Sequence, residues 1–85
     1  MFGGMKYIVY DTPLGETGII FDLLTDHAAV AHMFDISPDN ILGAGHVKAA
    51  DDGGIYCTGY STTLEGVRSR GFLDSEVINR QLRKS

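Results

Sequence analysis

The sequence predicts an α+β domain in which two β-hairpins form an antiparallel four-stranded sheet with two helices, in the order β-β-α-β-β-α. Two observations lead to this fold class. Segments rich in β-branched and aromatic residues occur in two pairs, and the members of each pair are separated by turn-forming residues. A segment with helical features follows each pair. The length of 85 residues fits a single domain over residues 1–85.

The first predicted hairpin pairs Lys6 to Asp11 (KYIVYD) with Thr17 to Asp22 (TGIIFD). The intervening TPLGE contains the proline and glycine that tight turns favour. A short helix is then expected from Asp26 to Phe34, because three alanines favour helix. Thr25 is its expected N-cap, and Leu24 is expected to pack on Ala29. Pro38, in DISPDN, ends the helical segment.

The second predicted hairpin pairs Ile41 to Ala49 with Ile55 to Ser61 around DDGG, which contains the strong turn dipeptide Asp-Gly. The simplest register places Ala50 opposite Ile55. In that register Tyr56 and Tyr60 share one face of the sheet with Val47, and the other face carries His46, Lys48 and Cys57. A one-residue slip inverts this assignment. Glycines at positions 43, 45 and 59 weaken a strand unless they mark bulges or let another group approach closely.

The second helix is expected to start after Asp74, whose carboxylate caps it, with Leu73 packing on Ile78. Its core-facing residues are expected to be Val77, Ile78 and Leu82. Cations near its end complement the helix dipole, and these are Arg80, Arg83 and Lys84. In the connector before this helix, Leu64 and Val67 are expected to act as anchors. Both helices are expected to cover one face of the sheet, leaving the other to solvent or to a second copy.

Composition limits the function classes. The net charge is -4, and residues 1–55 contribute two basic against eight acidic residues, whereas the rest of the chain has five basic against three acidic. This acidity argues against nonspecific binding of nucleic acid, which depends on neutralising phosphates. The apolar runs are too short to span a membrane, and the N-terminus lacks a secretory pattern. A single cysteine excludes an internal disulfide, so we expect a cytoplasmic protein, with an intermolecular disulfide left open.

Motifs for catalysis are weak. Gly43 and Gly45 begin like a dinucleotide fingerprint, but Lys48 stands at the third glycine position and no helix follows. His27 and His32 are five residues apart, which puts them on different sides of a helix, so we expect neither a metal nor another cofactor. His46 and Cys57 are diagonal neighbours in the predicted register, and such a pair could activate a thiolate. No orienting acid stands at a recognisable spacing, so a non-enzyme is the expected class.

Two arginines and two tyrosines complete the candidate binding residues. Arg68 and Arg70 could bind a carboxylate or phosphate. Alternatively they pair with acids, either local ones such as Glu65 and Asp74 or, in a second copy, Asp51 and Asp52. Tyr7, Tyr10, Tyr56 and Tyr60 could form an interface if they are partly exposed. The full set of candidate binding residues is Arg68, Arg70, His46, Cys57, Tyr56 and Tyr60.

The segments GAGHV and IYCTGYSTTLEGVRSR, with Asp74 followed by VI and L, resemble a family of very small uncharacterised bacterial and phage-associated proteins. The resemblance covers about half of the chain. It departs from the family pattern at Ala44 to His46 and at Gly59 to Ser61. It implies no transferable activity and suggests only a gene of a mobile element.

These observations lead to one functional prediction and two alternatives. The prediction is a non-catalytic interaction module that self-associates as a homodimer through a sheet face or edge, because a small core benefits from a partner. The first alternative is a phage or mobile-element regulator that binds a host protein or nucleic acid. The second is a Cys-His enzyme that uses Cys57 and His46.

Overall fold

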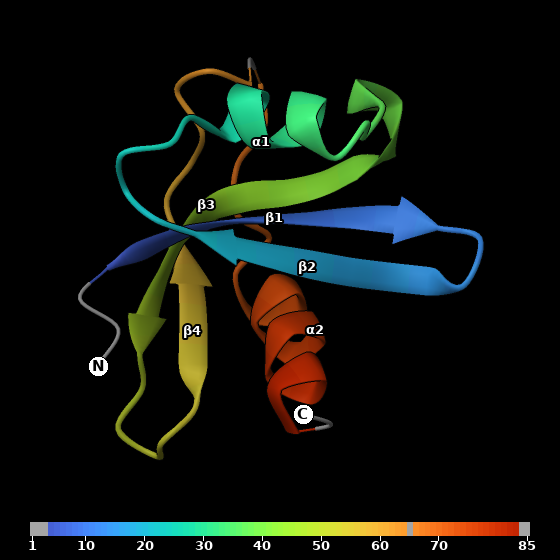
Figure 1. Ribbon diagram of the computed structural model, residues 1–85. Helices are drawn as coiled ribbons and strands as arrows, with labels where there is room; N and C mark the ends of the chain where they lie inside the picture. The colour runs from blue at the N-terminus through green and yellow to red at the C-terminus, as the bar shows by residue number, and fades with distance from the viewer. Residues whose placement is uncertain (1–3, 65, 84–85) are drawn as a thin grey trace.

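The computed structural model describes residues 4–64 and 66–83 of the chain (Figure 1). Its elements are, in order, β1 (Met5–Thr12), β2 (Gly15–Phe21), α1 (His27–Met33), the 3-10 turn η1 (Pro38–Asn40), β3 (Ile41–Ala49), β4 (Ile55–Thr58) and α2 (Phe72–Arg83). The α+β class and the antiparallel four-stranded sheet are confirmed. The predicted order of elements is interrupted by η1. Glu65 and Lys84 lie outside the described residues.

The sheet has the strand order β2-β1-β3-β4, so the first strand of each hairpin lies in the centre. The first part of β3 pairs with β1, and its last part pairs with β4. Figure 1 shows β3 curving between these two neighbours, so that β4 runs across the direction of β1 and β2. Such a strongly twisted sheet has a concave side that one helix can fill.

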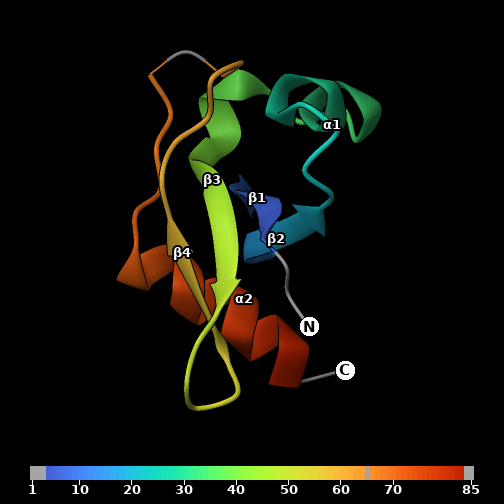
Figure 2. The ribbon, with the colours of Figure 1, turned by 90° about the vertical axis from the view of Figure 1, so that its left-hand side faces the viewer.

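The two helices lie on opposite faces of this sheet, and the prediction that they share one face is wrong (Figures 1 and 2). Tyr7 and Val9 pack in one core with Val77 and Ile78 of α2, together with Val47, Ile55 and Cys57. Ile8 packs in a second core with Val30, Ala31, Ile36 and Ala44 on the α1 side. Successive side chains of a strand point to opposite faces. β1 therefore buries side chains on both sides.

The connector before α2 joins the second core. Leu64 and Val67 pack against it as partly buried residues, so their predicted anchoring role is confirmed.

Both hairpins form, but the register of the second differs from the predicted one by one residue. Ala49, rather than Ala50, lies opposite Ile55, so Val47 pairs with Cys57 and His46 with Thr58. The turn is longer than expected because Ala50 is used in closing it: its N–H donates to the Gly54 carbonyl at 2.9 Å. The faces are accordingly inverted. Cys57 shares the α2 side with Val47, and Tyr56 shares the opposite side with His46 and Lys48.

The helix ends also differ from the predicted ones. Asp26, not Thr25, is the N-cap residue of α1, and Leu24 is 96% exposed, so it does not pack on Ala29. Helix α2 begins at Phe72, two residues before the predicted cap Asp74. Val77 and Ile78 are buried as predicted.

Leu73 and Leu82, which were expected to pack inward from α2, are 58% and 43% exposed. In the first turn of α2 the buried positions are occupied by Asp74 and Ser75, so the prediction that Leu73 packs inward is wrong, as is the one for Leu82.

Two carboxamide side chains of helix α2 form hydrogen bonds with the outer strands β4 and β2. Asn79 accepts from the N–H of Ile55 at 3.0 Å and donates to its carbonyl at 2.9 Å. On the opposite edge, Gln81 accepts from the N–H of Gly18 at 2.5 Å and donates to its carbonyl at 3.2 Å. Each carboxamide thus forms hydrogen bonds with the backbone N–H and carbonyl of a residue on an edge strand, as a neighbouring strand would.

None of the described helices is both long and apolar enough to traverse a lipid bilayer.

Candidate functional site

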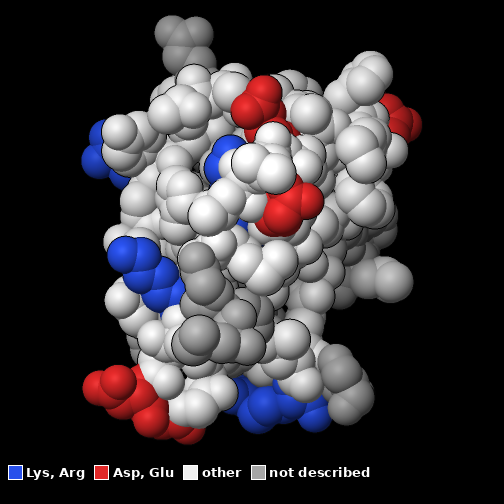
Figure 3. Space-filling model, turned by 60° about the vertical axis from the view of Figure 1, so that its left-hand side comes forward, with Lys and Arg blue, Asp and Glu red and all other residues white. Residues whose placement is uncertain are grey.

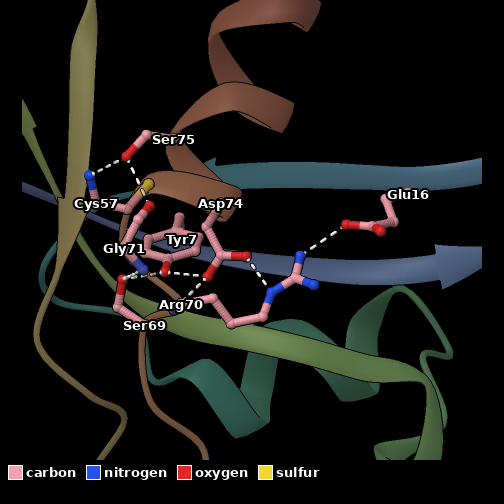
Figure 4. Close-up of polar contacts among 8 residues, drawn as sticks. All are labelled: Tyr7, Glu16, Cys57, Ser69, Arg70, Gly71, Asp74 and Ser75. Atoms are coloured by element: carbon pink, nitrogen blue, oxygen red, sulfur yellow. Dashed lines mark hydrogen bonds and ion pairs between the residues drawn. The ribbon is translucent and has the colours of Figure 1, made fainter.

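A buried polar cluster lies where α2 begins, centred on the Asp74 carboxylate (Figure 4). One carboxylate oxygen accepts from the Tyr7 hydroxyl at 2.5 Å and from the Arg70 backbone N–H at 2.9 Å. The other accepts from Nε of Arg70 at 2.7 Å. The Arg70 guanidinium continues to Glu16 at the start of β2, again at 2.7 Å. The Asp74 cluster therefore joins β1, β2 and the connector to the first turn of α2.

Ser69 extends the Asp74 cluster toward the start of the helix. Its hydroxyl forms a hydrogen bond with the Tyr7 hydroxyl at 2.7 Å and accepts from the Gly71 N–H at 2.9 Å. Among the described side chains that are not exposed, no buried polar atom lacks a hydrogen-bond partner. A fully satisfied network of this kind is the arrangement that a buried carboxylate requires for stability.

Gly43 of β3 makes room for this carboxylate. A Cβ atom built on Gly43 would overlap the Asp74 side chain, so no other residue fits there without displacing it. Gly45 is constrained in the same way by the Thr58 backbone carbonyl. The expectation that these strand glycines permit a close approach is confirmed, and it accounts for the glycine pattern that superficially resembles a dinucleotide fingerprint.

Two members of the Asp74 cluster, Tyr7 and Arg70, have a raised pKa. Burial, followed by the hydrogen bond to Asp74, raises the pKa of Tyr7 far above its ordinary value. Partial burial works to lower the pKa of Arg70, but Glu16 and Asp74 outweigh it and raise the pKa overall. Tyr7 is fully buried, so it does not meet the condition of partial exposure under which the tyrosines could form an interface. The Arg70 guanidinium is occupied by two acids, and one of them, Asp74, was among the partners expected from the sequence.

Cys57 lies beside the Asp74 cluster on the α2 side. Burial raises the pKa of its thiol to about 11, so the thiol is protonated at neutral pH. His46 lies on the opposite face of the sheet, so the register that made these two residues diagonal neighbours is wrong. Cys57 is only 5% exposed, which hinders an intermolecular disulfide as well as nucleophilic attack.

The histidines do not form a metal site in the described part of the chain, where no group of three or more potential ligands comes together. His27 is buried and its Nε2 donates to the Gly45 carbonyl at 2.9 Å, while His32 is exposed. The ring of His46 lies edge-on to that of His27, with centroids 6.2 Å apart. Burial is the main cause that lowers the pKa of His27. His27 is therefore a core residue in its neutral form.

Arg68 and Tyr60 lie next to each other in the structure, whereas Arg70 lies at a different place on the surface. They face each other in an isolated antiparallel bridge and line a hollow of about 390 Å³ in the loop after β4. Tyr60 is 63% exposed and Arg68 is also exposed. Arg70 lines a different hollow, with Glu16 and α2. The two arginines thus do not form a common binding fork.

The solvent-facing side of α2 carries the remaining candidate surface. We call the α2 outer face the set of exposed residues that follow one side of the helix, namely Phe72, Leu73, Glu76, Arg80 and Arg83. Phe72 is 80% exposed. A groove of about 510 Å³ runs between this face and β4, from Phe72 and Cys57 at one end to Asn79 and Arg83 at the other. A second hollow of about 380 Å³ lies on the other side of Glu76.

Charge is dispersed over the surface in the view of Figure 3, where acidic and basic side chains form small separate groups. Neither sign covers a continuous area there, whereas nucleic-acid-binding surfaces carry a basic patch or stripe.

No protein-family model matches the chain, and no curated protein or solved structure matches it. The comparisons therefore supply no activity.

Proposed function

We propose that this protein is a small non-catalytic interaction module that self-associates as a homodimer. The observation that carries the proposal is the α2 outer face, where two large apolar side chains, Phe72 and Leu73, stand in solvent at one end of a grooved surface. Scattered apolar residues are ordinary on a protein surface, but adjacent ones beside grooves are typical of contact sites.

The arrangement of the sheet favours this surface over the sheet itself. Each face of the sheet packs on a helix, and edge groups of Ile55 and Gly18 are occupied by the carboxamides of Asn79 and Gln81. The N–H of Cys57 on β4 is likewise bound, by the Ser75 hydroxyl at 2.8 Å. Self-association through a sheet face or the β4 edge would have to displace these contacts, and α2 offers a surface that needs no such change.

The non-catalytic class is supported by the chemistry of the two residues that suggested an enzyme. The Cys57 thiol is protonated and buried, and no imidazole shares its face of β3 and β4. A nucleophilic cysteine requires a depressed pKa and access to substrate. The free, buried state of Cys57 also agrees with the proposed cytoplasmic location.

The test is the solution mass measured by light scattering over a dilution series, at low and at high salt. We expect a dimer that dissociates on dilution and resists salt, because apolar contacts are not screened. A monomer at every concentration would refute the proposal.

A second candidate function follows from the Tyr60–Arg68 hollow. Exposed tyrosine and arginine side chains contribute disproportionately to protein interfaces. A regulator of a mobile element that binds a host protein could use this hollow. Such binding should weaken on Arg68→Ala substitution and survive changes in α2, which separates this candidate from the first.

A further inference from the structure

We propose that two copies pair through their α2 outer faces with the helices antiparallel, so that Glu76 of each copy faces Arg80 of the other. This inference rests on the proposed self-association and specifies its surface and its geometry. It is derived from the distribution of charge and apolar area along one helix.

The charges on the α2 outer face change sign along the helix. Glu76 lies in its first half, and Arg80 and Arg83 lie in its second half. In an antiparallel pair related by a two-fold axis, the first half of each helix lies over the second half of the other. Each Glu76 then faces one arginine of the other copy, so the same ion pair forms twice, once on each side of the axis. A parallel pair would instead place like charges together.

Within one copy, Glu76 and Arg80 interact only weakly. Glu76 and Arg80 form an ion pair at 3.6 Å, and both side chains are more than half exposed. Exposed pairs at this spacing on a helix contribute little to stability. The two side chains can therefore exchange their partner in the same helix for one in a second copy at small cost.

The apolar residues fit the same arrangement. The antiparallel pairing carries Phe72 of one copy toward the end of the other copy's groove that is lined by Asn79 and Arg83. An aromatic ring gains both from covering the aliphatic part of an arginine and from contact with its guanidinium. Phe72, which is 80% exposed in a single copy, would then be covered.

The area that a stable dimer buries favours a contact surface that extends beyond helix α2. A stable interface buries roughly 800 Å² per partner, which is about one seventh of the 5519 Å² surface of this chain. The grooves on either side of Glu76 extend the surface that the α2 outer face offers toward this area.

Charge reversal provides a test that depends on the proposed geometry. Glu76→Arg and Arg80→Glu, made separately, each place like charges across the two-fold axis, so each should raise the dimer dissociation constant by about tenfold at low salt. Mixed in equal amounts, the two variants should form a heterodimer of about the original affinity, because every cross-axis pair is again of opposite sign. Sedimentation velocity over a concentration series measures all three constants.

Phe72→Ser tests the apolar part and should raise the dissociation constant by about a hundredfold, at high as well as at low salt. Leu24→Ser is the matched control, because Leu24 is also a large apolar residue, 96% exposed, but lies before α1. It should leave the constant unchanged. Far-UV circular dichroism verifies that each variant is folded.

The outcomes separate the two proposals. A dimer that is insensitive to Phe72 and to both charge reversals overturns this inference and leaves the proposed function standing. A dimer weakened by Phe72→Ser but not rescued by mixing the charge variants overturns the antiparallel geometry. A wild-type chain that is monomeric throughout overturns the inference and the proposed function together.

Discussion

Replacing Asp74 by Asn should destabilise the fold strongly, although the two side chains have nearly the same shape. The Asp74 carboxylate is fully buried and accepts hydrogen bonds from Tyr7 and from two nitrogens of Arg70. An amide has one oxygen and one NH2 group. Whichever way it turns, the NH2 group faces an Arg70 nitrogen, which can only donate.

The magnitude follows from these lost contacts. A buried donor without a partner costs about 1–3 kcal/mol, and losing the charge weakens the remaining bonds by roughly 1 kcal/mol more. Arg70 keeps its bond to Glu16 and is partly exposed, so the larger cost of stranding a buried charge does not apply. We expect a loss of about 3 kcal/mol, from a stability of roughly 4–13 kcal/mol for a chain of 85 residues. The corresponding fall in Tm is about 12–24 °C.

The assay is urea unfolding followed by far-UV circular dichroism and tyrosine fluorescence, since the chain has no tryptophan. Asp39→Asn is the matched control, because Asp39 is an exposed acid in η1, outside α2, and the same change should alter stability there by less than about 0.5 kcal/mol. Tyr7→Phe should cost about 1–1.5 kcal/mol, and its effect should shrink in the Asp74→Asn background. A loss of under about 1 kcal/mol for Asp74→Asn would refute the view that this carboxylate holds α2 in place.

Three further predictions concern single buried positions. Gly43→Ala should cost about 2–4 kcal/mol because its Cβ displaces the Asp74 carboxylate, and the penalty measured by urea unfolding should fall below about 1 kcal/mol in an Asp74→Ala background. His27 has a lowered pKa in the folded state, so the unfolded chain binds more protons and stability should decline as the pH falls below about 6.5. His27→Gln should decline less between about pH 7.5 and 5.5, and an equal decline in both proteins would contradict this assignment. Cys57 should react with a thiol reagent on the order of a hundredfold more slowly in the native chain than in denaturant, and similar rates would mean that the thiol is accessible.

Local patterns in the sequence predict most of the elements. The boundaries of β3 match the expected Ile41 to Ala49. The first helix is within one residue of the expected range at either end. These segments are specified by residues close in the chain, such as the turn-forming TPLGE and the alanines of α1.

Which face of the sheet each helix covers is harder to predict from the sequence, because it depends on contacts between residues that are distant in the chain. One signal was available. Tyr7, Ile8 and Val9 are consecutive and apolar, and all three are fully buried. An uninterrupted apolar run is typical of a strand covered on both faces, whereas a strand with one solvated face alternates. Two helices on opposite sides follow from that pattern.

The register of the second hairpin could not be fixed from the sequence, because DDGG allows turns of different length. The extra turn residue is Ala50, whose N–H donates a hydrogen bond to the Gly54 carbonyl. Since a shift of one residue inverts the faces, the observed register places Cys57 beside α2 and His46 on the opposite face.

Most contacts of the candidate site could be identified only from the structure. The pairing of Arg70 with Asp74 is short in sequence and could be anticipated, but Tyr7 and Glu16 reach the same cluster from positions more than 50 residues away. The fit of Gly43 against Asp74 likewise appears only when β3 and α2 are placed together.

In the proposed dimer, helix α2 would combine two roles, securing the fold and contacting the second copy. Its inward side secures the fold through the Asp74 carboxylate and through Asn79 and Gln81 at the sheet edges. These contacts fix the helix against both outer strands, so its exposed side is presented in a constant position. A rigid surface loses little conformational entropy on binding, which favours association even through a modest area. Loosening the inward contacts, for example by Gln81→Ala, should therefore weaken self-association as well as stability, although Gln81 lines neither of the grooves that flank Glu76. If stability falls while the dimer dissociation constant of the folded protein is unchanged, the two roles of α2 are independent.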